Sequence, residues 1–163
     1  MIRKISTSDS EAIAEIYNHY IKNTIITFEE KEVSPDDIPG RIEKVVSESL
    51  PWIVAENMGR VIGYAYATLW RTRSAYRFSI ESTVYLEHNS TGSGIGSILY
   101  KELLSSLKDK GVHVVIGGIA LPNPPCIALH EKFGFKQVAH FEEVGFKCDA
   151  WIDVGYWQLQ FDS

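Results

Sequence analysis

Cysteine is scarce in this sequence of 163 residues, and Cys126 and Cys148 are the two that occur. Neither cysteine lies in the Cys-x-x-Cys or Cys/His spacing that is typical of a zinc site. The five histidines are scattered along the chain and are not paired at a metal-ligand interval. We therefore expect two buried free thiols and no metal.

Basic runs and long apolar segments are also missing. Sixteen Lys and Arg stand against 21 Asp and Glu, which gives a formal net charge of −5, and this balance argues against general affinity for nucleic acid. No apolar stretch approaches the ~20 residues of a membrane span. The N-terminus, Met-Ile-Arg-Lys-Ile-Ser, is too polar for a secretory signal. We expect a cytoplasmic protein with no nucleic-acid or membrane partner.

Hydrophobic residues make up 45% of the chain, enough for the core of one mixed α/β domain. No repeat or linker is visible, so we predict a single domain over residues 1–163. Helical spacing predicts four helices: from a capping box at 8–11, from 34 to about 49, after Gly96, and over 126–133. Strand patterns predict a short strand at 2–6, a hairpin of 52–56 with 61–69, and a third strand at 76–86. They also predict a buried central strand at 112–120 and a final antiparallel pair of 136–144 with 154–161.

Three glycines, Gly92, Gly94 and Gly96, stand between a strand-like segment at 80–86 and a helical run at 95–107. Glycine lets the main chain take positive φ and lets an anion approach closely. The free N–H groups and the dipole of a helix start attract negative charge. The segment therefore predicts a pyrophosphate site.

The glycines alone do not say which pyrophosphate compound binds. A Walker-type loop ends in Gly-Lys-Ser/Thr, whereas Gly96 is followed by Ser97 and Ile98. A dinucleotide fold places an acidic residue about twenty positions on, and here that position is the end of the predicted helix. Both patterns fit poorly, and a purely structural glycine turn stays open.

Three features at fixed separations resemble the GNAT superfamily of N-acetyltransferases. They are the strand and glycine turn at 80–97, the buried strand followed by Asn123, and the segment Leu129-His-Glu-Lys-Phe-Gly-Phe135. The resemblance implies a single-domain α/β (α+β) fold, with a central mixed, mostly antiparallel sheet flanked by helices. It also implies acetyl-CoA as co-substrate. The coenzyme-binding residues would be Val84, Tyr85, Leu86, Thr91, Gly92, Ser93, Gly94, Ile95, Gly96, Ser97 and Asn123.

Most of the chain is similar to one branch of that superfamily, the phosphinothricin and methionine sulfone/sulfoximine acetyltransferases. Seven segments carry this resemblance: 18–21, 27–28, 51–56, Trp70 with Arg73 and Tyr76, 81–85, 121–123 and 151–158. In two places the chain departs from the pattern. Thr91 stands where the superfamily usually has Gln or Arg, and Ile152 stands where phosphinothricin acetyltransferases commonly have a histidine. A main-chain phosphate cradle can survive the first change.

Acetyl transfer to an amine needs a base, and Glu81 is the candidate. It lies in an apolar and aromatic strand, where desolvation would raise the pKa of its carboxyl group; the alternative is a solvent-facing strand glutamate. His130 stands where many relatives have a tyrosine, so the resemblance implies that it protonates the leaving thiolate. Capping or packing on its helix is an equal alternative. A main-chain N–H on the strand with Val84 and Tyr85 would hold the oxyanion.

An acidic substrate needs a positive partner, and Arg73 is the best match among the arginines before Glu81, since a guanidinium suits a carboxylate or phosphinate. Phe28, Trp70 and Tyr76 complete the predicted substrate pocket, although a solvated loop and ordinary core packing are the alternatives. We predict an N-acetyltransferase acting on a small amino-acid-like amine by direct transfer, and the branch implies a homodimer. A non-catalytic acyl-CoA-binding domain and a protein N-terminal or lysine acetyltransferase remain alternatives.

Overall fold

The computed structural model describes residues 1–162, and in this range seven strands form one sheet in the order β1-β2-β3-β4-β5-β7-β6. The strands are β1 (Ile2–Lys4), β2 (Trp52–Asn57), β3 (Arg60–Leu69), β4 (Ser79–Leu86), β5 (Val114–Ala120), β6 (Lys136–Lys147) and β7 (Ala150–Gln160). The β4–β5 pair is parallel and the other pairs are antiparallel. The predicted mixed, mostly antiparallel sheet is confirmed.

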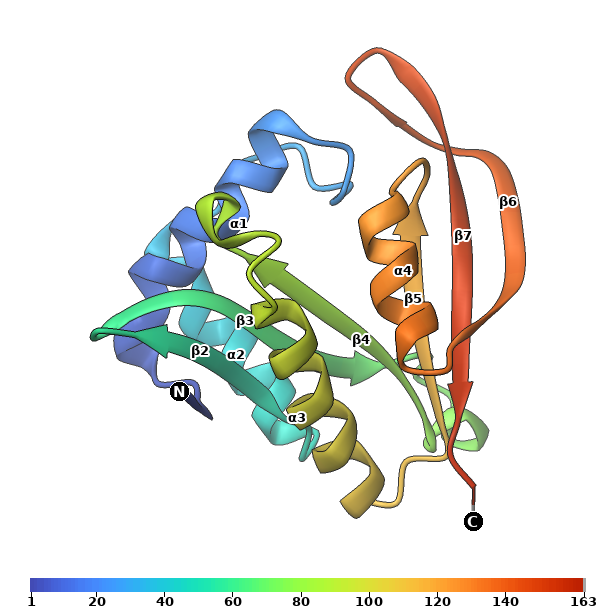
Figure 1. Ribbon diagram of the computed structural model, residues 1–163, viewed down its shortest axis with the longest axis horizontal. Coiled ribbons are helices and arrows are strands. Elements are labelled where there is room, and N and C mark those ends of the chain that lie inside the picture. Colours follow the sequence, from blue (N-terminus) through green and yellow to red (C-terminus); the bar gives the residue numbers. More distant parts are fainter. Residues whose placement is uncertain (163) are drawn as a thin grey trace.

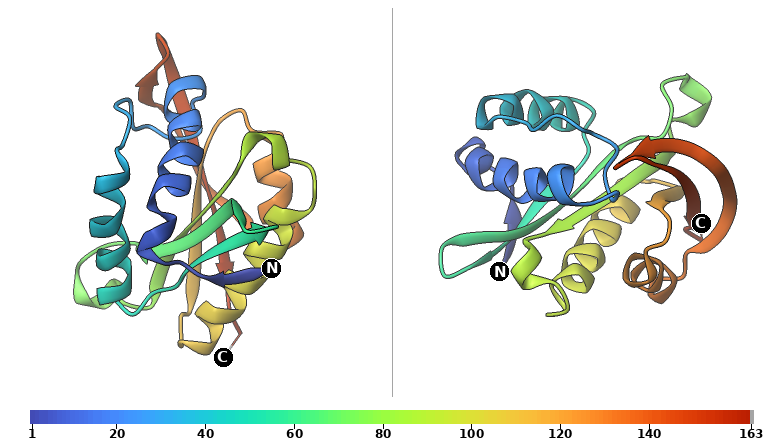
Figure 2. Two further views of the ribbon diagram at one scale, coloured as in Figure 1. Left: turned by 90° about the vertical axis from the view of Figure 1, so that its left-hand side faces the viewer. Right: turned by 90° about the horizontal axis from the view of Figure 1, so that it is seen from above.

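Helices cover both faces of the sheet. They are α1 (Ser10–Asn23), α2 (Ile38–Ser47), α3 (Ile95–Asp109) and α4 (Pro124–Lys132). Figure 2 shows α1 and α2 on one face and α3 and α4 on the other. The hairpin of β6 and β7 extends beyond the rest of the sheet (Figure 1). No helix within residues 1–162 is long and apolar enough to cross a membrane.

Helix α3 shows how the apolar pattern of the sequence becomes core. Leu99, Leu103 and Leu107 are spaced four residues apart and are each 0% exposed. This spacing places them on one helical face, which packs against β2, β3 and β4. Full burial of a leucine contributes roughly 1.5–3 kcal/mol. The helix that begins at the glycine loop is therefore anchored firmly to the strand that precedes the loop.

The structure corrects several predicted boundaries. The first capping box joins Ser6 and Asp9, not residues 8–11, and it opens a 3₁₀ turn ahead of α1. Residues 74–76 also form a 3₁₀ turn, so the third strand begins at Ser79 and not at 76. The fourth helix begins at Pro124, which as the first residue of a helix needs no N–H partner.

The final hairpin is longer than predicted. Its strands run over 136–147 and 150–160 and are joined at Cys148 and Asp149, with φ of +54° and +57°. Two consecutive left-handed residues are typical of a tight hairpin turn, but the sequence has neither Asn nor Gly there to signal it. Cys148 is exposed at this turn, so the prediction that both thiols are buried is wrong for Cys148.

Candidate active site

Strands β4 and β5 pair only where they begin. The paired residues are Ser79–Glu81 and Val114–Ile116, and no later pairing joins the two strands within residues 1–162. Beyond Glu81, β4 continues along β3 while β5 continues along β7. The two strands therefore diverge (Figure 1). From Ser82 onward, the edge of β4 that faces β5 has no strand partner in the described chain.

The free edge of β4 suits an extended ligand that carries amide groups. Main-chain N–H and C=O groups need partners, and a ligand can supply them as an added strand does. Val84, Tyr85 and Leu86 lie on this segment, and the Leu86 carbonyl already accepts a hydrogen bond from the Tyr20 hydroxyl. The pantetheine arm of coenzyme A carries such amides. Its contact with these three residues stays a prediction that the geometry supports.

The loop after β4 presents its main chain to an incoming ligand. Gly92 and Gly94 have φ of +77° and +86°, a region in which an L side chain is strained. Gly94 is the N-cap of α3 and provides no side-chain cap, so the N–H groups of the first turn need other partners. A Cβ at either glycine would meet no atom of residues 1–162 within 4 Å. This open cradle fits a pyrophosphate.

Side chains of the loop bond mainly to their own turn. The Thr91 hydroxyl donates to the His88 carbonyl at 3.0 Å, and the Ser93 hydroxyl donates to the Ser90 carbonyl. The Thr91 side chain therefore stabilises the loop itself. Helix α4 supplies a positive charge beside the loop, because the Lys132 ammonium donates to the Ser97 hydroxyl at 3.0 Å. Nothing in the sequence marks Lys132 for this position.

Asn123 shapes the opposite wall of this region. Its side-chain oxygen accepts a hydrogen bond from the Cys126 N–H at 3.3 Å and so caps α4. The helix therefore begins directly after β5, facing the free edge of β4. This role matches the structural alternative for Asn123. A direct contact with the coenzyme stays a prediction.

His130 is 4% exposed and makes hydrogen bonds at both ring nitrogens. Nδ1 lies 2.8 Å from the Cys126 carbonyl, and Nε2 lies 2.8 Å from the Tyr100 hydroxyl. A carbonyl only accepts, so Nδ1 carries the proton. Burial lowers the pKa of His130 and keeps the ring neutral. Nε2 must then accept from Tyr100, whose oxygen in turn accepts from the Ser82 hydroxyl.

This directed chain of hydrogen bonds joins α4, α3 and β4 behind the diverging strands. Gly117 of β5 makes room for it, because a Cβ there would lie 2.5 Å from His130 Nε2. In this arrangement the ring of His130 has no proton facing Tyr100 to give away. The arrangement matches the packing alternative for His130, and protonation of the thiolate by this residue stays a prediction.

Glu81 lies at the last paired position of β4, where the strands part. Its side chain is half-buried, and a Cβ at Gly118 would lie 3.5 Å from its Oε2 atom and 3.0 Å from the Tyr156 ring. Burial raises the pKa of Glu81, and the positive charge of Arg71 opposes this rise. A half-buried carboxyl group with a raised pKa, at the point where two strands part, is suited to proton transfer.

The segment between β3 and β4 carries three of the predicted substrate residues, Trp70, Arg73 and Tyr76. Arg73 and Tyr76 are joined within one turn, where Arg73 is the N-cap and its carbonyl accepts a hydrogen bond from the Tyr76 N–H. Trp70 lies edge-on to Tyr156, with ring centroids 5.4 Å apart. The Arg71 guanidinium lies 5.0 Å from the centre of the Trp70 ring. Glu81, Trp70, Arg71 and Tyr156 therefore form one cluster, which includes Arg71 in place of Arg73, the arginine that the family resemblance favours.

Phe28 approaches the sheet from a different segment. It follows α1 and packs over Gly145 of β6, where a Cβ would lie 2.4 Å from the Phe28 ring. Beside it, the buried Lys147 ammonium donates to the Thr27 carbonyl at 2.7 Å. These contacts fasten the hairpin to the segment after α1. The structure thus places Phe28 against the hairpin, and its contact with substrate stays a prediction.

Sequence reasoning missed four residues that the fold brings to this region. Tyr156 and Lys132 arrive from the far C-terminal third of the chain, while Tyr100 and Ser82 meet across α3 and β4. Ser82, Lys132 and Tyr156 fall within segments that carry the family resemblance, but their types are ordinary for core or surface positions, so nothing local marks them as site residues. No group of three or more His, Cys, Asp or Glu side chains in residues 1–162 could hold a metal ion.

Comparisons with known proteins agree with this geometry. Residues 2–155 match the family described as the acetyltransferase (GNAT) domain. Phosphinothricin N-acetyltransferase of Streptomyces viridochromogenes is 38% identical over 99% of this chain and 87% of its own. The structure of a ribosomal-protein-alanine N-acetyltransferase from Brucella melitensis matches with a TM-score of 0.97 and 34% identity, over 99% of each chain. An acetyltransferase of Salmonella typhimurium, solved with its cofactor acetyl-CoA, matches with a TM-score of 0.97 and 33% identity, over 100% of this chain and 94% of that one.

The diverging strands, the open glycine cradle and the half-buried carboxyl group suit an acyltransferase that uses a coenzyme A thioester. The chain belongs to the GNAT acetyltransferase family and is an acetyl-CoA-dependent N-acetyltransferase.

Proposed function

We propose that this protein transfers the acetyl group of acetyl-CoA directly to the amino group of a small amino-acid-like compound, of the phosphinothricin or methionine sulfone type. The observation that carries the proposal is the position of Glu81. It is a half-buried carboxyl group with a raised pKa, at the point where β4 leaves β5. The name of the Streptomyces relative supports the class of substrate.

Bound acetyl-CoA supplies a thioester carbonyl carbon that an amine can attack. Glu81 accepts the proton that the substrate ammonium loses, directly or through a water molecule. A main-chain N–H near Val84 or Tyr85 donates to the carbonyl oxygen as negative charge develops on it. The new C–N bond replaces the C–S bond, and the second proton that the attacking nitrogen loses ends on the departing sulfur. Cys126 and Cys148 take no part in this direct transfer.

We assign the phosphates of the coenzyme to the main chain of the glycine loop over 91–97. Lys132 adds a positive charge beside Ser97. We assign to it part of the phosphate binding that Arg or Gln usually provides in this superfamily, at the position that Thr91 occupies here. A lysine acts on phosphate as a point charge. The rest of the grip comes from the N–H groups at the start of α3.

We assign substrate binding to the cluster around Glu81. Trp70 and Tyr156 provide aromatic walls, and the guanidinium groups of Arg71 and Arg73 lie on the adjoining segment. A guanidinium can bind a carboxylate through two parallel hydrogen bonds. Tyr76 and Phe28, both 43% exposed, have ring surface left for contact with a substrate.

A second candidate function follows from the name of the Brucella structure, which is a ribosomal-protein-alanine N-acetyltransferase. The two functions differ in the size of the acceptor. We expect thiol release from acetyl-CoA with phosphinothricin, methionine sulfone and methionine sulfoximine, and little with peptides that begin with alanine. Faster thiol release with the peptides than with every free amino acid would replace our proposal by protein acetylation.

We also propose that the protein is a homodimer that uses the β6–β7 hairpin. Strand β6 is an edge of the sheet, and apolar side chains at least half exposed gather on the hairpin: Val138, Phe141, Val144, Phe146 and Trp151. An exposed edge strand with apolar side chains favours association with another chain. Phe146 and Trp151 lie together, with ring centroids 4.8 Å apart.

Replacing Trp151 by glutamate would test the dimer, because it puts a charge into the proposed apolar contact. Sedimentation velocity should show a dimer for the wild type and a monomer for Trp151→Glu. Met58→Glu is the matched control, since Met58 is 97% exposed at the distant β2–β3 turn, and it should stay dimeric. A monomeric wild type, or a dimeric Trp151→Glu variant, would contradict this interface.

A further inference from the structure

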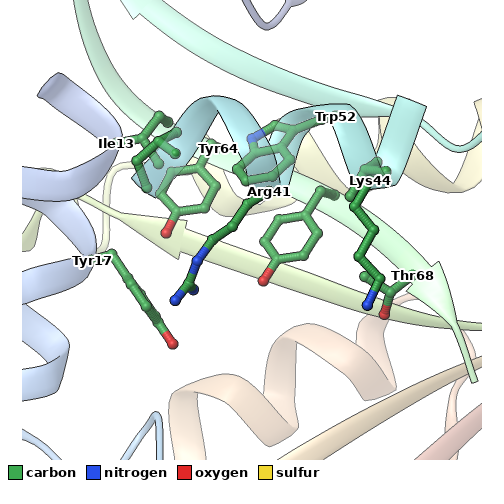
Figure 3. A pocket seen from close by; sticks show the side chains of 10 residues that line it. Ile13, Tyr17, Arg41, Lys44, Trp52, Tyr64 and Thr68 are labelled. Atoms are coloured by element: carbon green, nitrogen blue, oxygen red, sulfur yellow. The ribbon is translucent and has the colours of Figure 1, made fainter. Parts of the chain in front are cut away.

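A cavity of about 230 Å³ lies between α1, α2 and the sheet, and its lining includes Thr68, the cross-strand partner of Glu81. Figure 3 shows the side chains that line it. Aromatic rings form much of the lining: Tyr66 stacks on Trp52 with centroids 4.3 Å apart, and Tyr64 and Tyr17 extend the surface. Such a lining suits the carbon chain of a small ligand.

Two cations from one face of α2 enter this aromatic cavity. Arg41 and Lys44 are three residues apart and both line the cavity. Arg41 is already engaged, since both of its terminal nitrogens bond to Glu29, at 2.7 and 3.0 Å. Lys44 makes no ion pair within residues 1–162. In the view of Figure 3 its ammonium reaches toward the Thr68 hydroxyl. Lys44 is therefore the cation that remains available to an anionic ligand.

The cavity adjoins the predicted base through the pairing of β3 and β4. Thr68 is the direct cross-strand partner of Glu81, so the two side chains lie on the same face of the sheet, with Cβ atoms roughly 5 Å apart. Tyr66, one position further along that face, is paired with Thr83. A compound whose amino group lies at Glu81 can extend a short side chain past Thr68 into the cavity.

We propose that Lys44, with the Thr68 hydroxyl, binds the anionic end of the acceptor side chain. The enzyme then prefers α-amino acids whose side chain ends in a carboxylate or phosphinate over neutral ones of similar length. The rings of Tyr66 and Trp52 pack against the methylene groups between the two ends. This inference rests on the proposed small-molecule function, and it assigns Lys44 as a residue that determines specificity.

The test compares an anionic with a neutral acceptor. The value of kcat/KM is measured for phosphinothricin and for methionine sulfone, with the wild type and with Lys44→Gln. We expect Lys44→Gln to lower kcat/KM for phosphinothricin about tenfold through KM, the size of one lost charge-assisted hydrogen bond. The value for methionine sulfone should change by less than about twofold. Lys44 is exposed, so the variant should fold normally.

Lys108→Gln is the matched control, because Lys108 is an exposed lysine near the end of α3, on the opposite face of the sheet. It makes the same change in net charge and should leave the preference between acceptors unchanged. Equal losses for both acceptors in Lys44→Gln, or no loss for either, would overturn the inference.

A failure of the proposed function would give a different result, namely no thiol release by the wild type with either acceptor. Calorimetric titration of the two acceptors in the presence of coenzyme A would then test the role of Lys44 independently of turnover. Tighter binding of phosphinothricin than of methionine sulfone, lost in Lys44→Gln, would support the role of Lys44. Equal binding of the two compounds, or no binding of either, would refute it.

Discussion

Glu81→Gln should lower kcat by roughly 10²–10⁴-fold, the usual contribution of a positioned general base. Glutamine keeps the shape of the side chain but cannot accept a proton from an ammonium group. The KM for acetyl-CoA should change little, because Glu81 lies at the start of the diverging edge and not on the glycine loop. Steady-state kinetics with both substrates varied separate the two constants.

The pH profile gives this prediction a second, independent readout. Burial raises the pKa of Glu81, so the wild-type rate should climb with pH as the carboxyl group loses its proton at a pH above that of an ordinary glutamate. The variant should lack this limb. A profile of the same shape in Glu81→Gln, or an unchanged kcat, would remove Glu81 from the role of base.

Unfolding measurements exclude damage to the fold as the cause. Because the folded-state pKa of Glu81 is raised, the folded protein holds this proton more tightly than the unfolded chain does. Its contribution to stability is fully present below the unfolded pKa and is lost as pH rises through the folded pKa. Glutamine cannot show that loss. The stability of Glu81→Gln relative to the wild type should therefore increase with pH, even though its activity is low.

Gly94→Val should weaken acetyl-CoA binding by at least about tenfold, because one lost charge-assisted contact has that value. The residue has a φ of +86° at the start of α3, and a valine there would strain the backbone by about 1–2 kcal/mol. A Cβ at this position meets no atom of the described protein within 4 Å. Any branched side chain would instead occupy the open cradle assigned to the phosphates.

Gly59→Val separates backbone strain from obstruction of the cradle. Gly59 has a φ of +80°, and its Cβ position is equally open, but it lies at the β2–β3 turn. We expect both variants to lose similar stability in thermal unfolding, and only Gly94→Val to lose affinity for acetyl-CoA in calorimetric titration. Equal affinity in the two variants would show that the loop does not hold the phosphates.

The parts of the fold that follow from local pattern could be predicted from the sequence. Leucines four residues apart specify α3, and its glycine-rich start specifies the cradle, because both depend on residues near one another in the chain. The resemblance to a known family supplied the coenzyme, and the apolar, aromatic strand around Glu81 supplied the candidate base. These inferences needed no knowledge of which strands pair.

Other features depend on contacts between distant segments, and the sequence does not display them. The divergence of β4 and β5 follows from pairing between residues 79–81 and 114–116, and no residue type marks where pairing stops. The chain from Ser82 through Tyr100 to His130 crosses three elements. The cavity at Lys44 likewise depends on how α2 packs on β3.

The most direct test of the account is a count of products after the protein is mixed with acetyl-CoA, first alone and then with phosphinothricin. Free thiol is measured by a colorimetric reagent, and the acetylated amine by mass spectrometry. The account predicts no thiol release before the amine is added, and equal amounts of thiol and N-acetylated product afterwards. Thiol release without amine, with the acetyl group found on the protein, or tight binding of acetyl-CoA with no product from any amine, would contradict direct transfer.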